Sequence, residues 1–285
     1  MPELIVAAAT PLRDGGRALD EGSIAAYVAF LESHGADGVF ACGTTGEGVL
    51  LTIEERRLVA RAYRDAVRGR LIVHAGAQST ADTVALATHA GEIGADAVAV
   101  IPPPYFVLDT DALTVHMVAA AHACAPLPFY GYAFAARSGY PLSLEVIDRI
   151  RNEADNFAGL KVSESPFDRV RPYLALDLPL YVGSEPLIPA ALAAGAVGAV
   201  SGMAAAFPEL VRAVVDAPDA AGQARLQAVR AALEASGQFV ASVKQVLGRR
   251  GVAVSPEMRA PLRRLTDTEA EALDRAVAEL ELLPA

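Results

Sequence analysis

Lysine is the rarest charged residue of this 285-residue chain, which has only two lysines, Lys161 and Lys244, beside 22 arginines. Acidic residues number 34 against 24 basic ones, and the formal net charge at pH 7 is −10. Nucleic acids and anionic membranes are bound through basic patches, so this charge balance argues against both kinds of partner. Because the chain uses arginine almost everywhere, a lysine at a given position indicates a need for an amine there.

Cysteine is equally scarce, with only Cys42 and Cys124 in the chain. Two thiols without metal-ligand spacing around them argue against a disulfide scaffold and fit a reducing cytoplasm. No uninterrupted apolar stretch reaches the roughly eighteen residues of a membrane-spanning helix. Residues 1–3 lack the basic start of a secretory signal. We therefore expect a cytoplasmic protein that makes no use of a membrane.

Short apolar runs alternate with longer helical patterns along most of the chain. Eight runs are apolar on both faces, as buried parallel strands are. They span residues 4–9, 38–42, 71–74, 97–101, 127–132, 157–161, 180–182 and 197–201. Helical patterns separate them at residues 22–33, 53–67, 81–93, 111–123, 144–152, 167–176 and 187–194. This alternation predicts an α/β fold of the (β/α)₈ TIM-barrel type.

An open, doubly wound sheet is the main alternative to the barrel. It usually carries a G-x-G-x-x-G dinucleotide fingerprint after its first strand, which this chain lacks. After residue 201 the alternation stops, and helices are predicted over residues 208–215, 220–247 and 268–282. We expect a barrel over residues 1–205 and a C-terminal helical extension over residues 206–285, packed on the barrel as one structural domain overall.

Lys161 is the strongest candidate for a catalytic group. Active sites of TIM barrels lie at the carboxyl ends of the strands, and Lys161 ends the apolar run 157–160. Arginine keeps its proton near neutral pH, whereas a desolvated lysine can lose it and attack a carbonyl. The alternative is a lysine whose ammonium extends from the strand end into solvent. Lys244 falls in a helical pattern, where a solvated or carbonyl-capping lysine is expected.

Two further motifs lie at predicted strand ends. Tyr130 and Tyr132 share one face of the fifth strand, from which a phenol could exchange protons with an amine on the sixth. Ordinary core filling is the alternative, more so for Tyr130. The loop 43–47 offers backbone N–H groups and the hydroxyls of Thr44 and Thr45 before a helix, which suits a carboxylate. A phosphate site, here without a Walker lysine, and a plain glycine turn are the alternatives.

The five histidines of the chain form no convincing set of metal ligands. His74 ends the third predicted strand, where it either faces the site or fills the core. His116, His122 and Cys124 share a helical pattern without the i, i+4 spacing of a zinc motif. We predict no metal.

Together these motifs resemble the dihydrodipicolinate synthase/N-acetylneuraminate lyase family of Schiff-base-forming barrels over nearly the full length. The loop 43–47 reads GTTGE, the signature of that family, and Gly159, Leu160 and Lys161 match its G-[IL]-K around the Schiff-base lysine. Further matches are the Thr-Pro at 10–11, the strand-five segment 127–132, and the strand-seven and strand-eight motifs at 183–185 and 198–202.

The resemblance implies an enzyme without metal or organic cofactor that acts on a 2-oxo acid such as pyruvate and on an aldehyde. Lys161 would form the imine, and Tyr132, with its hydroxyl oriented by Thr44, would transfer protons. Thr45 and neighbouring amides would bind the carboxylate, and the carbonyl of Val200 would face the reacting carbon. A homotetramer built as a dimer of dimers is also implied. The implied substrate-binding residues are Thr45, Gly46, Arg137, Ser163, Glu185 and Val200.

Departures from the family pattern bear on which reaction runs. A tyrosine that reaches the neighbouring subunit's site in many members is replaced here by Phe106. Arg137 falls where the synthases hold a second carboxylate. Ser163 is more typical of the lyases, and Glu185 lies where lyases bind the hydroxyls of a sugar-acid chain. Pro186 replaces a carboxylate that sialic acid lyases use.

We therefore predict a class I lyase or aldolase that joins or releases pyruvate and an aldehyde, with a 2-keto-3-deoxy sugar acid as one candidate substrate. Arg137 supports an alternative, dihydrodipicolinate (4-hydroxy-tetrahydrodipicolinate) synthase. A 2-keto-3-deoxy sugar acid dehydratase is favoured only by Phe106. A non-catalytic 2-oxo acid sensor and a metal-dependent barrel hydrolase are the remaining hypotheses, and the histidine pattern disfavours the hydrolase.

Overall fold

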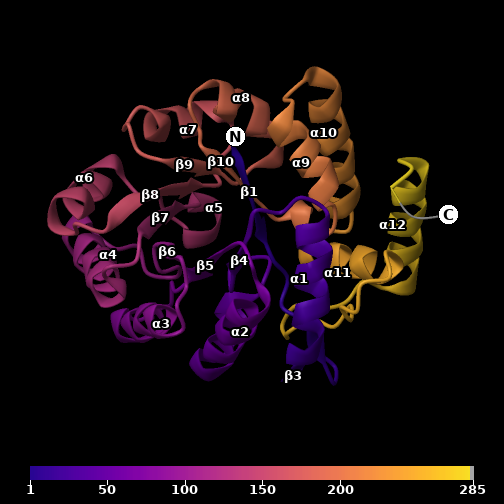
Figure 1. Ribbon diagram of the computed structural model, residues 1–285, viewed down its shortest axis with the longest axis horizontal. Helices are drawn as coiled ribbons and strands as arrows, with labels where there is room; N and C mark the ends of the chain where they lie inside the picture. Colours follow the sequence, from indigo (N-terminus) through magenta and orange to yellow (C-terminus); the bar gives the residue numbers. More distant parts are fainter. Residues whose placement is uncertain (283–285) are drawn as a thin grey trace.

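The computed structural model describes residues 1–282 and contains a closed barrel of eight parallel strands (Figure 1). The first strand pairs with both the second and the last barrel strand, which closes the barrel. The predicted (β/α)₈ barrel is confirmed. In chain order its strands are β1 (Glu3–Ala7), β4 (Gly38–Ala41), β5 (Arg70–His74), β6 (Ala97–Val100), β7 (Phe129–Ala133), β8 (Phe157–Val162), β9 (Leu180–Val182) and β10 (Gly198–Ser201).

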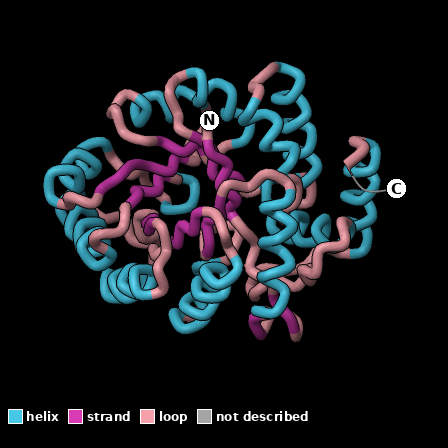
Figure 2. Tube along the Cα trace, viewed as in Figure 1, coloured by secondary structure: helices cyan, strands magenta, loops and turns pink. Residues whose placement is uncertain are grey.

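Helices surround the strands on the outside of the barrel, as Figure 2 shows. The second of them begins at a capping box in which Thr52 and Glu55 satisfy each other's backbone N–H groups. Within residues 1–282 every helix is too short or too polar to cross a bilayer. The helices between the strands are α1 (Ile24–Ser33), α2 (Ile53–Ala66), α3 (Thr80–Glu92), α4 (Thr110–Cys124), α6 (Leu144–Glu153), α7 (Phe167–Leu174) and α8 (Ile188–Ala193).

The C-terminal extension contains the predicted helices with one correction. A single helix over residues 220–247 is wrong, because the chain breaks near Gly237, whose φ of 71° lies in the left-handed region that ends helices. The first helix of the extension packs against β1 and β10, next to α8 (Figure 1). The four helices are α9 (Pro208–Asp216), α10 (Ala220–Glu234), α11 (Phe239–Arg249) and α12 (Asp267–Glu279).

Several short elements escaped the sequence prediction because they are too short to show a period. The α-helical turn α5 follows β7, and 3₁₀ turns follow several strand ends. These elements are β2 (Leu12–Arg13), β3 (Ala18–Leu19), α5 (Ala135–Ser138), η1 (Glu21–Ser23), η2 (Gly48–Leu50), η3 (Glu185–Leu187) and η4 (Met203–Ala205).

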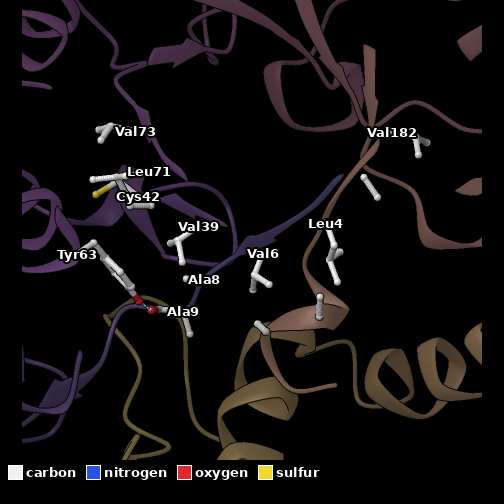
Figure 3. Packing of buried hydrophobic residues seen from close by; sticks show 14 of the residues in the cluster. Leu4, Val6, Ala8, Ala9, Val39, Cys42, Tyr63, Leu71, Val73 and Val182 are labelled. Atoms are coloured by element: carbon white, nitrogen blue, oxygen red, sulfur yellow. Dashed lines mark hydrogen bonds between the residues drawn. The ribbon is translucent and has the colours of Figure 1, made fainter. Parts of the chain in front are cut away.

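Side-chain alternation along the strands separates two apolar cores. Successive residues of a strand face opposite sides, so Leu4 and Val6 pack against the helices while Ile5 points into the barrel. Figure 3 shows part of the outer core, where the hydroxyl of Tyr63 on α2 donates to the carbonyl of Ala9. The inner core is smaller and includes the aromatic rings of Phe40, Tyr130, Tyr132 and Tyr181.

Candidate active site

A cavity of about 470 Å³ opens at the carboxyl ends of the strands, and residues of both the barrel and the extension line it. The structure brings most of the predicted site residues into its wall. Gly46 is the exception: it does not line the cavity, and its carbonyl accepts a hydrogen bond of 2.6 Å from the Thr10 hydroxyl. The predicted residues in the wall are Thr44, Thr45, Tyr132, Arg137, Lys161, Ser163, Glu185 and Val200.

Lys161 points into the barrel because its strand neighbours Leu160 and Val162 belong to the outer core. Its side chain is buried, and Nζ lies 3.9 Å from the ring centroids of both Phe40 and Tyr132. Burial lowers the pKa of the ammonium, because the charged form loses hydration that the neutral amine does not need. The alternative of a lysine extending into solvent is therefore wrong.

Tyr132 is the phenol beside this amine. It lies directly opposite Lys161 in the register between β7 and β8. Its ring packs edge-on against Phe40 and His74, each with a centroid distance of 5.9 Å. Tyr130 also faces inward, but it packs against Tyr181 and does not line the cavity.

His74 lies in the cavity wall, a position that the sequence left open. Its Nδ1 is 3.1 Å from the carbonyl oxygen of Cys42, so Nδ1 carries the proton and donates it to that carbonyl. Burial lowers the pKa of the imidazole well below its usual value, so the ring is neutral. Its buried Nε2 has no hydrogen-bond partner within residues 1–282.

The loop 43–47 folds tightly against the barrel. Glu47 has a φ of 55°, and a side chain at Gly48 would collide with the carbonyl of Cys42. Thr45 is buried, whereas Thr44 is exposed. Gly202 lets the loop approach β10, because a Cβ there would lie 2.9 Å from Oγ1 of Thr45.

Lys244 corrects a prediction, because it is not solvated. Its side chain is fully buried, and Nζ lies 2.5 Å from Oε1 of Glu47, which is buried as well. Nζ also donates to the carbonyl of Glu257 at 2.7 Å, in the segment between α11 and α12. The helical pattern does not show that the face of α11 with Lys244 packs against the loop 43–47. The scarcity of lysine in the chain was the signal that could have indicated a structural role for Lys244.

Glu185 is buried and fully engaged. Its Oε1 accepts hydrogen bonds from the hydroxyl of Ser201 and from the backbone N–H of Met203, at 2.8 and 3.1 Å. Its Oε2 accepts from Nη1 of Arg230 at 2.8 Å. Arg230 and Glu234, both on α10, also line the cavity. Neither residue was predicted from the sequence, because the residue pattern of α10 does not show that this helix packs beside the carboxyl ends of the strands.

Arg137 lies on the short helix α5, exposed and with its guanidinium 5.8 Å from the ring centroid of Phe134. The carboxylate of Glu164 fixes this helix by accepting the N–H of Ala135 at 2.6 Å. Glu164 follows β8, so the segment after Lys161 holds the helix that carries Arg137.

Phe106 lies outside the cavity wall on the exposed loop between β6 and α4. Tyr105, Phe106 and Val107 are 85%, 70% and 74% exposed. Within residues 1–282, no three side chains of His, Cys, Asp or Glu converge to hold a metal ion.

A closed (β/α)₈ barrel with a buried amine between aromatic rings, at the end where barrel active sites form, defines the class of protein. The chain belongs to the Dihydrodipicolinate synthetase family, which it matches over residues 1–280. The resemblance inferred from the GTTGE and G-L-K motifs is thereby confirmed.

Known relatives agree with this membership. An uncharacterised DapA-like lyase of Halobacterium salinarum is 39% identical over 287 residues, covering 95% of this chain and 91% of that protein. The structure of Proteus mirabilis N-acetylneuraminate lyase superposes with a TM-score of 0.88 at 28% identity, covering 99% of both chains. That of T. tenax KD(P)GA gives a TM-score of 0.89 at 27% identity, covering 98% of this chain and 99% of that one. The family comprises lyases and aldolases that act on small molecules, which supports a lyase here.

Proposed function

We propose that this protein is a carbon–carbon lyase that captures a 2-oxo acid such as pyruvate as a Schiff base on Lys161. The observation that carries the proposal is the buried Lys161 amine, held between Phe40 and Tyr132 in the wall of a 470 Å³ cavity. A lysine whose pKa is lowered by burial is a nucleophile near neutral pH. The proposal needs neither a metal nor an organic cofactor.

The chemistry begins when the neutral amine of Lys161 attacks C2 of the 2-oxo acid. Tyr132 gives its proton to the hydroxyl of the resulting carbinolamine, so that water leaves and a protonated C=N bond replaces the C=O bond. The Tyr132 phenolate then takes the proton from the hydroxyl on C4, the C3–C4 bond breaks, and its electron pair moves into the protonated C=N bond to give an enamine. The aldehyde leaves, C3 is protonated, and addition of water releases pyruvate and the amine. The same steps in reverse join pyruvate to an aldehyde.

The other residues of the wall would bind and orient the 2-oxo acid. We assign its carboxylate to the hydroxyl of Thr45 and the backbone N–H groups near Gly46. Thr44 would orient the hydroxyl of Tyr132, and the carbonyl of Val200 would face the reacting carbon.

The proposed substrate is the adduct of pyruvate and an aldehyde, with 2-keto-3-deoxy sugar acids as the leading candidates. Ser163 in the cavity wall, and Arg230 held there by Glu185, favour this choice. The second candidate is 4-hydroxy-tetrahydrodipicolinate synthase, because Arg137 also lines the cavity and could hold a distal carboxylate.

The proposal is tested by trapping the imine. The protein is incubated with pyruvate, reduced with borohydride and digested, and the adduct is located by peptide mass spectrometry. We expect it on Lys161. The chain contains a single other lysine, Lys244, so the assignment is unambiguous. A folded protein that yields no adduct with pyruvate or a larger 2-oxo acid contradicts the proposal.

The pH dependence of trapping gives a separate prediction. Burial lowers the pKa of Lys161 below the ordinary lysine value of 10.5, so the rate of imine formation should reach half its maximum below pH 10.5. The unfolded chain keeps this proton to higher pH than the folded chain. The free energy of unfolding should therefore rise with pH between the two pKa values. Lys161→Met should remove this rise, which urea titrations at several pH values would measure; an unchanged slope contradicts the lowered pKa.

We also propose a homotetramer built as a dimer of dimers. The loop residues Tyr105, Phe106 and Val107 form an exposed apolar tip of the kind that a second copy covers. Phe106→Asp should therefore lower the molar mass measured by light scattering after gel filtration. Val197→Asp, at a partly exposed valine directly before β10, is the control. A wild-type protein that elutes as a monomer contradicts this assembly.

The cytoplasm is the proposed compartment. Cys42 and Cys124 are both buried and neither forms a disulfide. Burial raises the pKa of each thiol to about 11, so both stay protonated and unreactive. Such thiols suit a reducing environment.

A further inference from the structure

The helix α10 of the extension contributes a polar wall to the cavity. It packs on the turn η3, which begins with Glu185, and lies near α8 and α9 in Figure 1. Three charged side chains meet there: Glu185, Arg230 and Glu234. All three line the same cavity as Lys161.

Glu185 forms an ion pair with Arg230 and holds its guanidinium in place. Its two oxygens together accept hydrogen bonds from Ser201, Met203 and Arg230, and the side chain is 95% buried. Little of this carboxylate is left to contact a substrate. Glu185 therefore acts on a substrate through the guanidinium that it positions.

Arg230 has donors to spare. A guanidinium has five N–H groups. In Arg230 the Nη1 group bonds Glu185, while Nε and Nη2 both point at Oε1 of Glu234, at 3.0 and 2.9 Å. Two N–H groups remain without a partner among residues 1–282, and about a third of the side chain is exposed. Burial opposes the charged form, but the two carboxylates outweigh it and raise the pKa of Arg230, so the group stays charged.

The formal charge of Glu185, Arg230 and Glu234 together determines which substituents this part of the cavity attracts or repels. Two carboxylates and one guanidinium leave a net charge of −1, which repels a second carboxylate or a phosphate. A neutral hydroxyl can accept from the spare N–H groups of Arg230 and donate to Glu234, whose side chain is 48% exposed.

The order of strands gives the direction of the substrate. In the barrel, β8 with Lys161 lies between β7 and β9. The helix with Arg137 follows β7, and Glu185 follows β9. A chain attached to Lys161 can therefore extend toward either group, but toward only one of them at a time.

We propose that Arg230 and Glu234 form a hydroxyl-binding subsite that selects an uncharged, polyhydroxylated tail on the 2-oxo acid, with Glu185 as the residue that positions Arg230. This inference rests on the proposed function and names the substrate class of the same site. It places the specificity of a barrel reaction partly in the C-terminal extension.

The test compares three aldehydes as partners of pyruvate. Glyceraldehyde carries hydroxyls, propanal has the same three-carbon chain without them, and succinate semialdehyde carries a carboxylate. We expect the wild-type protein to prefer glyceraldehyde. Arg230→Met should lower kcat/KM for glyceraldehyde at least about 10-fold, the usual effect of losing hydrogen bonds to a charged group, with little change for propanal. Arg225→Met, at an exposed arginine of α10 outside the cavity wall, is the matched control and should change none of the three.

Two further variants keep the proposal testable if Arg230→Met unfolds. Glu234→Gln removes a charge that is half exposed, and kcat/KM for succinate semialdehyde should rise because the wall becomes neutral. Arg230→Lys keeps the positive charge but loses the planar guanidinium with its several N–H donors. This variant should therefore fold, but it should keep only part of the preference for glyceraldehyde.

A wild-type protein that prefers succinate semialdehyde overturns the subsite, as does an Arg230 variant that slows all three aldehydes equally. Borohydride trapping of pyruvate separates this failure from a failure of the proposed function. The adduct on Lys161 should still form in the Arg230 and Glu234 variants. Absence of the adduct in the wild type would instead refute the Schiff-base chemistry.

Discussion

The Lys161→Ala variant should lose the condensation of pyruvate with glyceraldehyde almost completely, to below about 1% of the wild-type rate. The reason is that alanine removes the only group in the cavity wall that can form an imine with the carbonyl carbon. Lys161→Arg should be equally inactive, because a guanidinium stays protonated and cannot attack. The measurement is product formation over time in the folded variants, with folding checked by circular dichroism.

The second lysine provides the internal control for this prediction. The amine of Lys244 is committed to Glu47 and to the carbonyl of Glu257, so it should take no borohydride-reduced adduct. In Lys161→Ala the yield of labelled peptide should therefore fall to background. Labelling of Lys244, or product formation above about 1% in Lys161→Ala, would contradict a Schiff base on Lys161.

The Lys244→Met variant should lose about 3–5 kcal/mol of unfolding free energy. Removing the ammonium leaves Glu47 as a buried carboxylate that, within residues 1–282, keeps one hydrogen bond, from the N–H of Arg259 at 2.7 Å. Because Glu47 ends the loop that holds Thr45, KM for pyruvate should rise as well. The double variant Glu47→Gln/Lys244→Met should recover much of the stability, since no unpaired charge is left. Urea unfolding and steady-state kinetics measure the two effects.

Arg249→Met is the matched control for Lys244→Met. Arg249 lies on the same helix and forms an ion pair with Asp274. The pair is partly exposed, since 55% of the Arg249 side chain and 19% of the Asp274 side chain are exposed. Such pairs contribute about 0–1 kcal/mol. If Lys244→Met lowers the unfolding free energy no more than Arg249→Met does, the buried pair of Glu47 and Lys244 does not stabilise the loop 43–47.

The barrel could be predicted from the sequence because each buried strand is an apolar run and each helix has its own period. Lys161 could be found for a chemical reason: the chain avoids lysine and places one at a strand end. The helix break at Gly237 was missed because one glycine inside a long alanine- and leucine-rich pattern is also compatible with a continuous helix.

The contribution of the extension to the site could not be predicted from local patterns. Arg230 lies 45 residues from Glu185 in sequence, and Lys244 lies 197 residues from Glu47. Such pairs depend on how helices pack across the end of the barrel, which hydrophobic periodicity does not specify. Helix α5, which carries Arg137, has only four residues, too few to show a helical period. The hydrogen bond by which Glu164 holds this helix could therefore not be predicted either.

The separation of Glu47 from Lys244 also matters while the chain is being synthesised. At about 5–20 residues per second, the 197 residues between them take the ribosome roughly 10–40 s. Throughout that interval Lys244, the partner of the Glu47 carboxylate in the folded protein, has not been made, and an unpaired carboxylate is more stable in water than buried. All eight strands have been made by Ser201, yet the loop 43–47 still lacks the ion pair that compensates the burial of Glu47. We infer that the barrel and the extension mature together, with the substrate cavity among the last parts of the nascent protein to form.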